Sequence, residues 1–573
     1  MSGDGMFRYH RLFSDFLLRR AGVSPERRRT LHARAAQYYA QAGDREEAVQ
    51  HLLAADDHEG AAHILTEIAP AMAEGGRHQV LGSMLEHLPN EVLGAHPALL
   101  YARGETLRLA GRYADALPAF EQAIARFRAK GDAAGEVRAI RGQALVYLDT
   151  VQPARADTLL RGALRKVRGD SAERQAFYTL LAENTLNSGN LRRAERMYRA
   201  VHRMGGPPPP ARLFVRLGRF ADVRALSEAE RLAARVKPLS RAPRSHREPS
   251  ALLAWTEAMI GEAELARQHA EESLEVGHAL GSPTVESIAL ARLGLAWLSG
   301  RDMDPARARQ LSEDAIRLAS RIGIERFEVE PLLALTIIAG IEGRALDAEA
   351  HASRALRIAR DGGDTWVGAL LHLAAGAALA LAEKPDAATW LRRAVQIATS
   401  CGDRYVACAA SLWLAIHASR FGSAEAAREH FAVALQAAQR EGYGFLFQGS
   451  ALLAPHNPAL WSGLLRRAQK QDAYARELIR QLESGADGDT SALTVEHRAT
   501  AALYVQTLGA FRVWRRGQEI DRAAWGREKA VQLLQLLVCH RGHALHREQV
   551  LEALWPDATA SAAATGLRVA VSA

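Results

Sequence analysis

The chain has 573 residues, of which 48% are hydrophobic and only 6% aromatic, and its formal net charge of +8 comes from 73 Lys and Arg against 65 Asp and Glu. This length is too great for a single hydrophobic core and predicts several domains or one extended array. The scarcity of aromatic residues favours stacked helices rich in Ala and Leu over a β-sandwich. The small charge excess does not by itself indicate a nucleic-acid partner.

Residues 1–97 are predicted to be helical. Phenylalanines recur at helical spacing in FRYHRLFSDFL (residues 7–17), and a second helical pattern follows in LHARAAQYYAQAGDREEAVQHLLAA (residues 31–55). In MalT-like bacterial transcription activators, a segment that resembles the first stretch closes the winged-helix part of a nucleotide-binding switch, and helices that resemble the second stretch follow it. The resemblance implies a preceding ATPase, but the chain contains no phosphate-binding P-loop motif, so no nucleotide-binding residue is assigned. Either the ATPase was lost or this reading frame is a fragment.

Residues 98–482 are predicted to form a helical-repeat array that is interrupted near 205–250. One pattern recurs in residues 332–363, 370–402 and 411–442, where an apolar helix and a short polar break precede a second, Ala-rich helix that stops at a glycine. A repeat of about 40 residues with two helices per unit is typical of an α-solenoid, because such a hairpin buries its apolar stripe only by stacking on its neighbours. The predicted stop glycines are Gly131, Gly281, Gly323, Gly363, Gly402 and Gly442.

The array resembles tetratricopeptide repeats of the lengthened kind found in MalT-like activators, and GRYADALPAFEQAIARF (residues 111–127) is its nearest match to the tetratricopeptide consensus. The resemblance implies that one face of the array binds a small-molecule inducer or a protein partner, without indicating which residues line that face. Two irregular stretches account for the interruption, GGPPPPARL (205–213) and ARVKPLSRAPRSHREPS (234–250). The second is expected to be a surface loop rather than a nucleic-acid contact.

The composition changes at residues 483–500, ESGADGDTSALTVEHRAT, which are predicted to form a flexible linker. A second domain is expected over 501–573. Residues 503–520 alternate in the manner of β-strands around a turn, and helical patterns follow them. Short strands followed by three helices predict a small α+β winged-helix domain. The helical patterns cover 525–542, 546–557 and 561–573.

The motifs LGAFRV, LLQLLVCHRG, REQVLEALWPD and LRVAVS resemble the OmpR-like winged helix of SARP-type bacterial activators. The resemblance implies that the third helix enters the major groove of double-stranded promoter DNA, while the start of the second helix and the surrounding loops contact phosphates. In the family a two-stranded wing follows, so the domain is expected to be incomplete at its C-terminus. The resemblance assigns Arg527, Lys529, His546 and Arg547 to phosphate contacts, and Thr565, Arg568 and Ser572 to the groove.

No catalytic motif is apparent in the chain, which lacks a P-loop, a dinucleotide fingerprint and the common hydrolase motifs. His540, His543 and His546 have no Cys or carboxylate set to complete a metal site, and the three cysteines form no C-x-x-C pair. The N-terminus lacks the apolar core of a signal peptide, and the longest apolar run, residues 366–382, is expected to be a buried repeat helix rather than a membrane span. We therefore predict a cytoplasmic protein that is not an enzyme, needs no metal or cofactor, and has no membrane contact.

The predicted fold class is mainly α, with a tetratricopeptide-like α-solenoid followed by a small α+β winged-helix domain. Two functions are consistent with this organisation. In the first, the chain is a bacterial transcription regulator whose repeat array receives an inducer or a protein signal and controls exposure or self-association of the DNA-binding domain. In the second, it is a tetratricopeptide-type scaffold that binds proteins and carries a non-functional remnant of a DNA-binding domain.

Overall fold

The computed structural model describes residues 24–167, 171–236, 249–483, 503–506, 511–515, 518–520, 525, 528–539, 545–556 and 558–572. The chain divides into two compact units, Met1–Ile479 and Arg480–Ala573. The helix predicted at 7–17 lies outside the described residues, and so does the predicted linker, 483–500, apart from Glu483.

The described part of the first unit begins with a group of helices that packs around an apolar cluster, which includes Leu65, Leu81 and Leu93 and continues into the helices that follow. Asp44 and Asp57 each accept a hydrogen bond from a backbone N–H three residues later, and these caps start α3 and α4. The helices of this group are α2 (Pro25–Ala42), α3 (Arg45–Ala54), α4 (His58–Glu74), α5 (His78–Glu86) and α6 (Asn90–Ala95).

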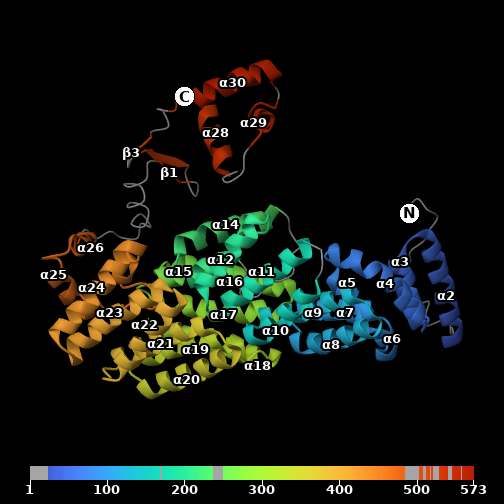
Figure 1. Ribbon diagram of the computed structural model, residues 1–573, viewed down its shortest axis with the longest axis horizontal. Helices are drawn as coiled ribbons and strands as arrows, with labels where there is room; N and C mark the ends of the chain where they lie inside the picture. Colours follow the sequence, from blue (N-terminus) through green and yellow to red (C-terminus); the bar gives the residue numbers. More distant parts are fainter. Residues whose placement is uncertain are drawn as a thin grey trace. The chain divides into compact units, whose positions relative to one another are not determined.

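The rest of the first unit is an array of helix pairs joined by short turns (Figure 1). All six predicted stop glycines have the left-handed backbone that ends a helix, for example Gly323 with φ 71° and Gly363 with φ 80°. The prediction of a mainly helical, tetratricopeptide-like α-solenoid is therefore confirmed. The pairs are α7 (Pro97–Leu109) and α8 (Tyr113–Ala129), α9 (Ala133–Asp149) and α10 (Pro153–Lys166), α11 (Ser171–Asn187) and α12 (Leu191–Arg203), α13 (Ala211–Arg216) and α14 (Phe220–Val236), α15 (Pro249–Ile260) and α16 (Ala263–Leu280), α17 (Pro283–Ala296) and α18 (Pro305–Ile322), α19 (Val329–Ile341) and α20 (Ala345–Gly362), α21 (Thr365–Leu381) and α22 (Ala387–Cys401), and α23 (Arg404–Phe421) and α24 (Ala424–Glu441).

The first helices of successive pairs form an inner layer, because α15, α17, α19, α21 and α23 contact one another in turn as well as their own partners. Small residues permit this packing. A Cβ atom added at Gly340 of α19 would collide with the backbone of Ala378 in α21. The apolar run at 366–382 forms α21, and nearly all of its side chains are buried among other helices, as predicted. Within the described ranges, no helix combines the length and apolarity needed to cross a bilayer.

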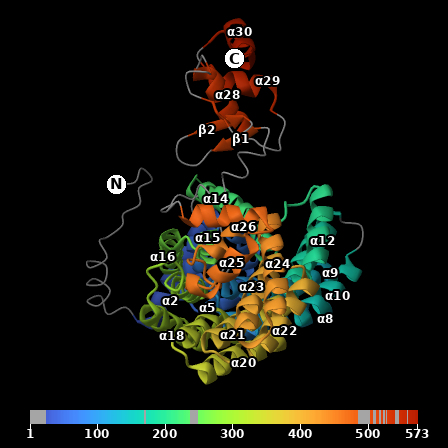
Figure 2. The ribbon, with the colours of Figure 1, turned by 90° about the vertical axis from the view of Figure 1, so that its left-hand side faces the viewer.

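The array curves until late repeats touch earlier ones (Figure 2). The ring of Phe220, at the start of α14, packs against Tyr405 of α23 with 5.0 Å between ring centroids. The Tyr443 hydroxyl donates a hydrogen bond to the Gly218 carbonyl oxygen at 3.1 Å. The same α23 tyrosine also reaches α15 (Pro249–Ile260), because the Tyr405 hydroxyl donates to the Met259 carbonyl oxygen at 3.5 Å.

An irregular segment after α24 fills the inside of this curve. Phe445, Leu446 and Phe447 are buried in the same apolar cluster as the inner helices, and the Leu452 N–H donates to the Ala258 carbonyl oxygen at 3.0 Å. The repeat pattern did not predict this role, because the segment is not a helix pair. It contains the short 3₁₀ helices η3 (Gly444–Phe447) and η4 (Pro458–Leu460), then α25 (Ser462–Ala468) and α26 (Ala473–Glu483).

The second unit contains a three-stranded antiparallel sheet in the order β1-β2-β3. The helices that follow share a small apolar core of Leu533, Val550, Leu554 and Ala570. Among the described residues, strands precede helices as in the predicted order, and α28 begins at Glu528 rather than at 525. The winged-helix assignment itself stays a prediction. The elements are β1 (Leu503–Gln506), β2 (Arg512–Arg515), β3 (Gln518–Glu519), α28 (Glu528–Cys539), α29 (Arg547–Leu554) and α30 (Ala560–Ser572).

Candidate functional site

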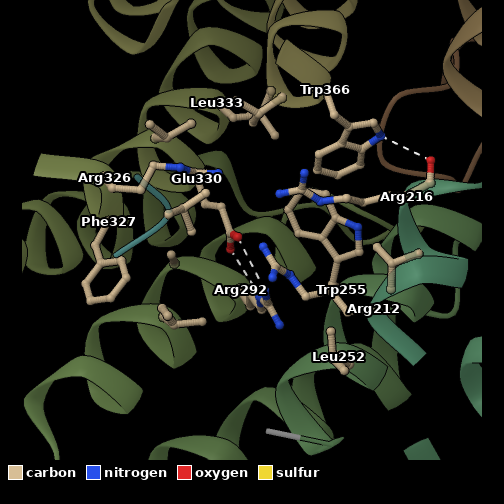
Figure 3. Close-up of a pocket in the computed structure, with 16 residues that line it drawn as sticks. Arg212, Arg216, Leu252, Trp255, Arg292, Arg326, Phe327, Glu330, Leu333 and Trp366 are labelled. Atoms are coloured by element: carbon tan, nitrogen blue, oxygen red, sulfur yellow. Dashed lines mark hydrogen bonds and ion pairs between the residues drawn. The ribbon is translucent and has the colours of Figure 1, made fainter. Parts of the chain in front are cut away.

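A cavity of about 60 Å³ lies where the first helices of successive repeats converge, from α13 through α15, α17 and α19 to α21 (Figure 3). The 3₁₀ helix η2 (Glu325–Glu328), which precedes α19, completes the wall. Most of the wall is apolar and includes the rings of Trp255, Phe327 and Trp366. We call the cavity the arginine pocket after the four arginines in its wall: Arg212, Arg216, Arg292 and Arg326.

Arg292 and Glu330 form an ion pair between neighbouring repeats inside the pocket (Figure 3). The Arg292 Nε donates to Glu330 Oε2 at 3.1 Å, and its Nη2 donates to Oε1 at 3.3 Å. This two-point geometry is the one in which a planar guanidinium matches a carboxylate. Arg292 is only 5% exposed, so the pair is held away from bulk water.

A second cluster joins repeats that are far apart in the sequence. Arg216 of α13 donates to both oxygens of Asp364, at 3.2 and 3.0 Å, and Arg326 of η2 donates to Asp364 Oδ2 at 2.9 Å. Burial by itself raises the pKa of the Asp364 carboxyl, but the charges of Arg216 and Arg326 outweigh burial and hold its pKa below the ordinary value. Asp364 therefore stays ionised and binds α13, η2 and the start of α21 together.

Two tryptophans hold the guanidinium groups in place. The Arg216 Cζ lies 4.6 Å from the centroid of the Trp366 ring, and the Arg292 Cζ lies 5.8 Å from that of Trp255. The Trp366 Nε1 donates to the Arg216 carbonyl oxygen at 3.2 Å and to Asp403 Oδ2 at 2.7 Å. Arg216 is thus fixed by its backbone, its ring contact and its ion pair.

Two donors of the pocket are left over after these contacts. Arg292 Nη1 and Arg326 Nε are buried, and neither has a hydrogen-bond partner among the described residues. A buried donor without a partner costs about 1–3 kcal/mol. The arginine pocket therefore has hydrogen-bonding capacity that this chain does not use.

The residues predicted to contact DNA all belong to the second unit. His546 and Arg547 are exposed at the start of α29, and Thr565 and Arg568 are exposed on α30. The Thr565 hydroxyl donates to the Ser561 carbonyl oxygen at 3.0 Å. These four assignments stay predictions, since their exposure is compatible with DNA contact but does not test it.

Lys529 has a structural contact within the second unit. Its Nζ donates to the Leu554 carbonyl oxygen at 2.5 Å and lies 5.6 Å from the centroid of the Trp555 ring. The predicted phosphate contact would have to compete with this arrangement. Arg527 lies outside the described residues, and Ser572 is the last residue of α30, with its side chain outside the description.

The arginine pocket was not predicted from the sequence. A signal was available in α17, where Arg292 stands in the otherwise apolar run IALARLGLAW (288–297). A charged residue inside such a run is buried with a partner more often than it is left alone. Its partners come from other repeats, and the sequence pattern does not specify which repeats meet.

A larger hollow of about 920 Å³ lies between α5, α7, α8 and the end of α16. Three of its charged side chains already pair with one another at the surface. Arg112 contacts Glu86 at 3.0 Å and Asp115 at 2.8 Å, and these three side chains are all more than half exposed. The arginine pocket is the stronger candidate, because its charges are buried.

No family model matches the chain. Among curated proteins, it is 31% identical over 168 residues to serine/threonine-protein kinase PknK from Mycobacterium tuberculosis (strains CDC 1551 / Oshkosh and H37Rv) and Mycobacterium bovis. The matched segment is 28% of this chain and 15% of the kinase, so the chain spans about 15% of the length of these relatives.

Among solved structures, the chain is similar to a Rap protein complexed with competence and sporulation factor, with a TM-score of 0.42 and 10% identity over 61% of this chain and 97% of that one. It is similar to a STAND protein with a tetratricopeptide repeat sensor from Pyrococcus horikoshii, with a TM-score of 0.28 and 14% identity over 77% and 56% of the two chains. It is also similar to the APC/C hetero-tetramer Cut9–Hcn1, with a TM-score of 0.36 and 11% identity over 80% and 98%.

The class of the first unit follows from its own helix pairs, stop glycines and inner layer. It is a tetratricopeptide-like helical-repeat array with a buried pocket on its inner helices.

Proposed function

We propose that this chain is a tetratricopeptide-type interaction protein that binds a protein partner or a small ligand through the arginine pocket. The observation that carries the proposal is the pair of buried donors, Arg292 Nη1 and Arg326 Nε, left without partners in a pocket built from successive repeats. In this proposal the protein binds its partner without catalysing a reaction, and it acts in the bacterial cytoplasm.

The energetics of the pocket support a binding role. Burying a guanidinium group is costly unless it is paired, and well-packed apolar residues would stabilise the same helix junction at least as well. The chain nevertheless carries four arginines at this one junction. A structural role explains the donors that pair with Asp364 and Glu330, but it does not explain the donors that remain.

Site-specific photo-cross-linking tests the proposal. The photoreactive analogue p-benzoylphenylalanine would replace Phe327, which lines the pocket, or Phe421, which is 46% exposed at the end of α23 and serves as the matched control. We expect irradiation of producing cells to yield an adduct of defined mass from position 327 and not from position 421. No adduct from 327, or the same adducts from both positions, would overturn the proposal.

A second candidate function is DNA binding by the second unit, as in a transcription regulator controlled by the array. It is favoured by one observation, that in the described part of the second unit three short antiparallel strands precede three helices, with Arg547 and Arg568 exposed on the last two. The test is fluorescence anisotropy of the full chain with duplex DNA from upstream of neighbouring genes, across a salt series. We expect the double variant Arg547→Ala/Arg568→Ala to weaken binding and to reduce the salt slope by about 1, which is the share of the phosphate contact assigned to Arg547, while Arg420→Ala leaves both unchanged. DNA binding that changes neither with the double substitution nor with salt concentration would refute this function.

Self-association belongs to the same regulatory proposal. Light scattering after size-exclusion chromatography, with and without the cross-linked partner, measures it directly. A change in the number of chains per particle, after the mass of the partner is subtracted, would show that partner binding controls self-association, and an unchanged number would refute this part of the proposal.

A further inference from the structure

We propose that the arginine pocket binds an oxyanion, a carboxylate or phosphate group, with Arg292 and Arg326 as its direct contacts. This inference rests on the proposed function, which it deepens by naming the chemical class of the ligand. It follows from the free donors, the charge of the wall and the size of the cavity.

The free donors suit an anion that arrives without displacing existing contacts. Arg292 uses Nε and Nη2 for Glu330, so both hydrogens of Nη1 remain. Arg326 uses Nη2 for Asp364, so its Nε–H remains. A carboxylate or phosphate offers several acceptor oxygens and no obligatory donor. It can therefore accept from both arginines while the two ion pairs persist.

The groups around the cavity carry a net positive charge, because its four arginines outnumber the three carboxylates that contact them. Four guanidinium groups line it, and Glu330 is the one carboxylate among its lining residues. The other acids in contact with these arginines are Asp364 and Glu183, and neither of them lines the cavity. Because Arg212, Arg216 and Arg292 are all at least nine-tenths buried, their attraction for an anion is weakened little by water. The site therefore selects negative charge over neutral polar groups.

The volume selects a small group. To hold one water molecule, a cavity needs roughly 10–15 Å³ of volume that a water-sized sphere can occupy. The arginine pocket, at about 60 Å³, holds a few waters or one group the size of a carboxylate or phosphate. A larger organic body would stay outside the cavity, so the pocket recognises the anionic group of its ligand or partner.

The experiment titrates the full-length chain with inorganic phosphate in one arm and sodium acetate in the other, with ionic strength held constant by sodium chloride. Tryptophan fluorescence reports on Trp255 and Trp366 in the wall, and calorimetry measures the stoichiometry. We expect saturable binding of one ion per chain in at least one arm. The arm that saturates at the lower concentration identifies the carrier group as phosphate or carboxylate.

Two conservative variants test the assigned contacts. Arg292→Lys and Arg326→Lys keep the positive charge opposite Glu330 and Asp364 but lose the spare guanidinium hydrogens. We expect each to weaken binding at least tenfold while circular dichroism stays unchanged. The matched control is Arg420→Lys, at an exposed arginine whose Nη1 lies 3.0 Å from Glu383. It should bind as the unaltered chain does.

The inference would be overturned if neither arm showed saturable binding. It would also be overturned if the Arg292→Lys and Arg326→Lys variants bound the ion as tightly as the unaltered chain does. Its failure is distinguishable from failure of the proposed function. An adduct at position 327 without oxyanion binding would mean that the pocket takes a neutral partner. Absence of both would mean that the four arginines only hold the repeats together.

Discussion

Replacing Arg216 by Met should loosen the junction between α13 and α21 more than any surface change. Methionine replaces the aliphatic part of the arginine side chain but lacks the guanidinium group. That group donates to both Asp364 oxygens and, at 2.7 Å, to the Leu186 carbonyl oxygen. Asp364 has a side chain that is 0% exposed. The Arg216→Met variant therefore leaves a buried carboxylate with Arg326 as its remaining cationic partner among the described residues.

The expected magnitude follows from these contacts. Removing one partner of a buried ion pair costs about 3–5 kcal/mol, and the contact of Arg326 with Asp364 places the effect toward the lower end. Since every 1.4 kcal/mol is a factor of about ten, amides that exchange by local opening should exchange roughly 100-fold faster or more. A repeat array opens locally, so the change should be confined to α13 and the beginning of α21.

Hydrogen–deuterium exchange read by mass spectrometry is the assay. The matched control is Arg309→Met, which removes a partly exposed ion pair with Glu342 at 2.7 Å, and such pairs contribute about 0–1 kcal/mol. We expect less than about a tenfold change in that variant. If Arg216→Met altered exchange in α13 and α21 no more than the control alters its own helices, the assigned role of the buried cluster would be wrong.

Three further predictions concern packing, pH and the second unit. Gly340→Ala should destabilise the array by about 1–3 kcal/mol in urea unfolding, because the new Cβ collides with Ala378. The control Gly162→Ala, whose Cβ meets no atom within 4 Å, should stabilise the array by about 0.5–1 kcal/mol. Equal effects of the two substitutions would refute the close packing of Gly340 against Ala378. Burial raises the pKa of Asp403 from 3.8 to about 6, with hydrogen bonds only partly offsetting it, so its contribution to stability is full below pH 4 and lost as pH rises through 6. The stability of Asp403→Asn relative to the unaltered chain should therefore improve by about 2.4 kcal/mol between pH 4 and pH 7, and a constant difference in urea unfolding would contradict this. Lys529→Met should lower the free energy of local opening at the end of α29 by about 1–2 kcal/mol, so that its amides exchange roughly 5–30-fold faster. Unchanged exchange with weaker DNA binding would favour the phosphate contact instead.

Much of the fold could be predicted from the sequence, because the forces that set it are local. A helix that ends in the left-handed conformation needs a residue that tolerates positive φ. Gly363 is such a residue, and it directly follows the last residue of α20. The continuous apolar run at 366–382 identified α21 as a helix buried within the array, and Val505 and Val513 belong to the alternating stretch that forms paired strands. These inferences need only a window of about 10 to 20 residues.

The candidate site depended on tertiary structure. Arg216 and Asp364 are 148 residues apart in the sequence, and they meet because small rotations between neighbouring repeats accumulate into a curve. Periodicity reports that a helix has an apolar face but not how far each repeat turns relative to the last. Nor does it show that Phe445 and its neighbours fill the inside of that curve. The amino-acid sequence thus determined where helices begin, end and bury their apolar faces, while the accumulated curvature of the array decided which buried arginines face one cavity and which of their donors remain unpaired.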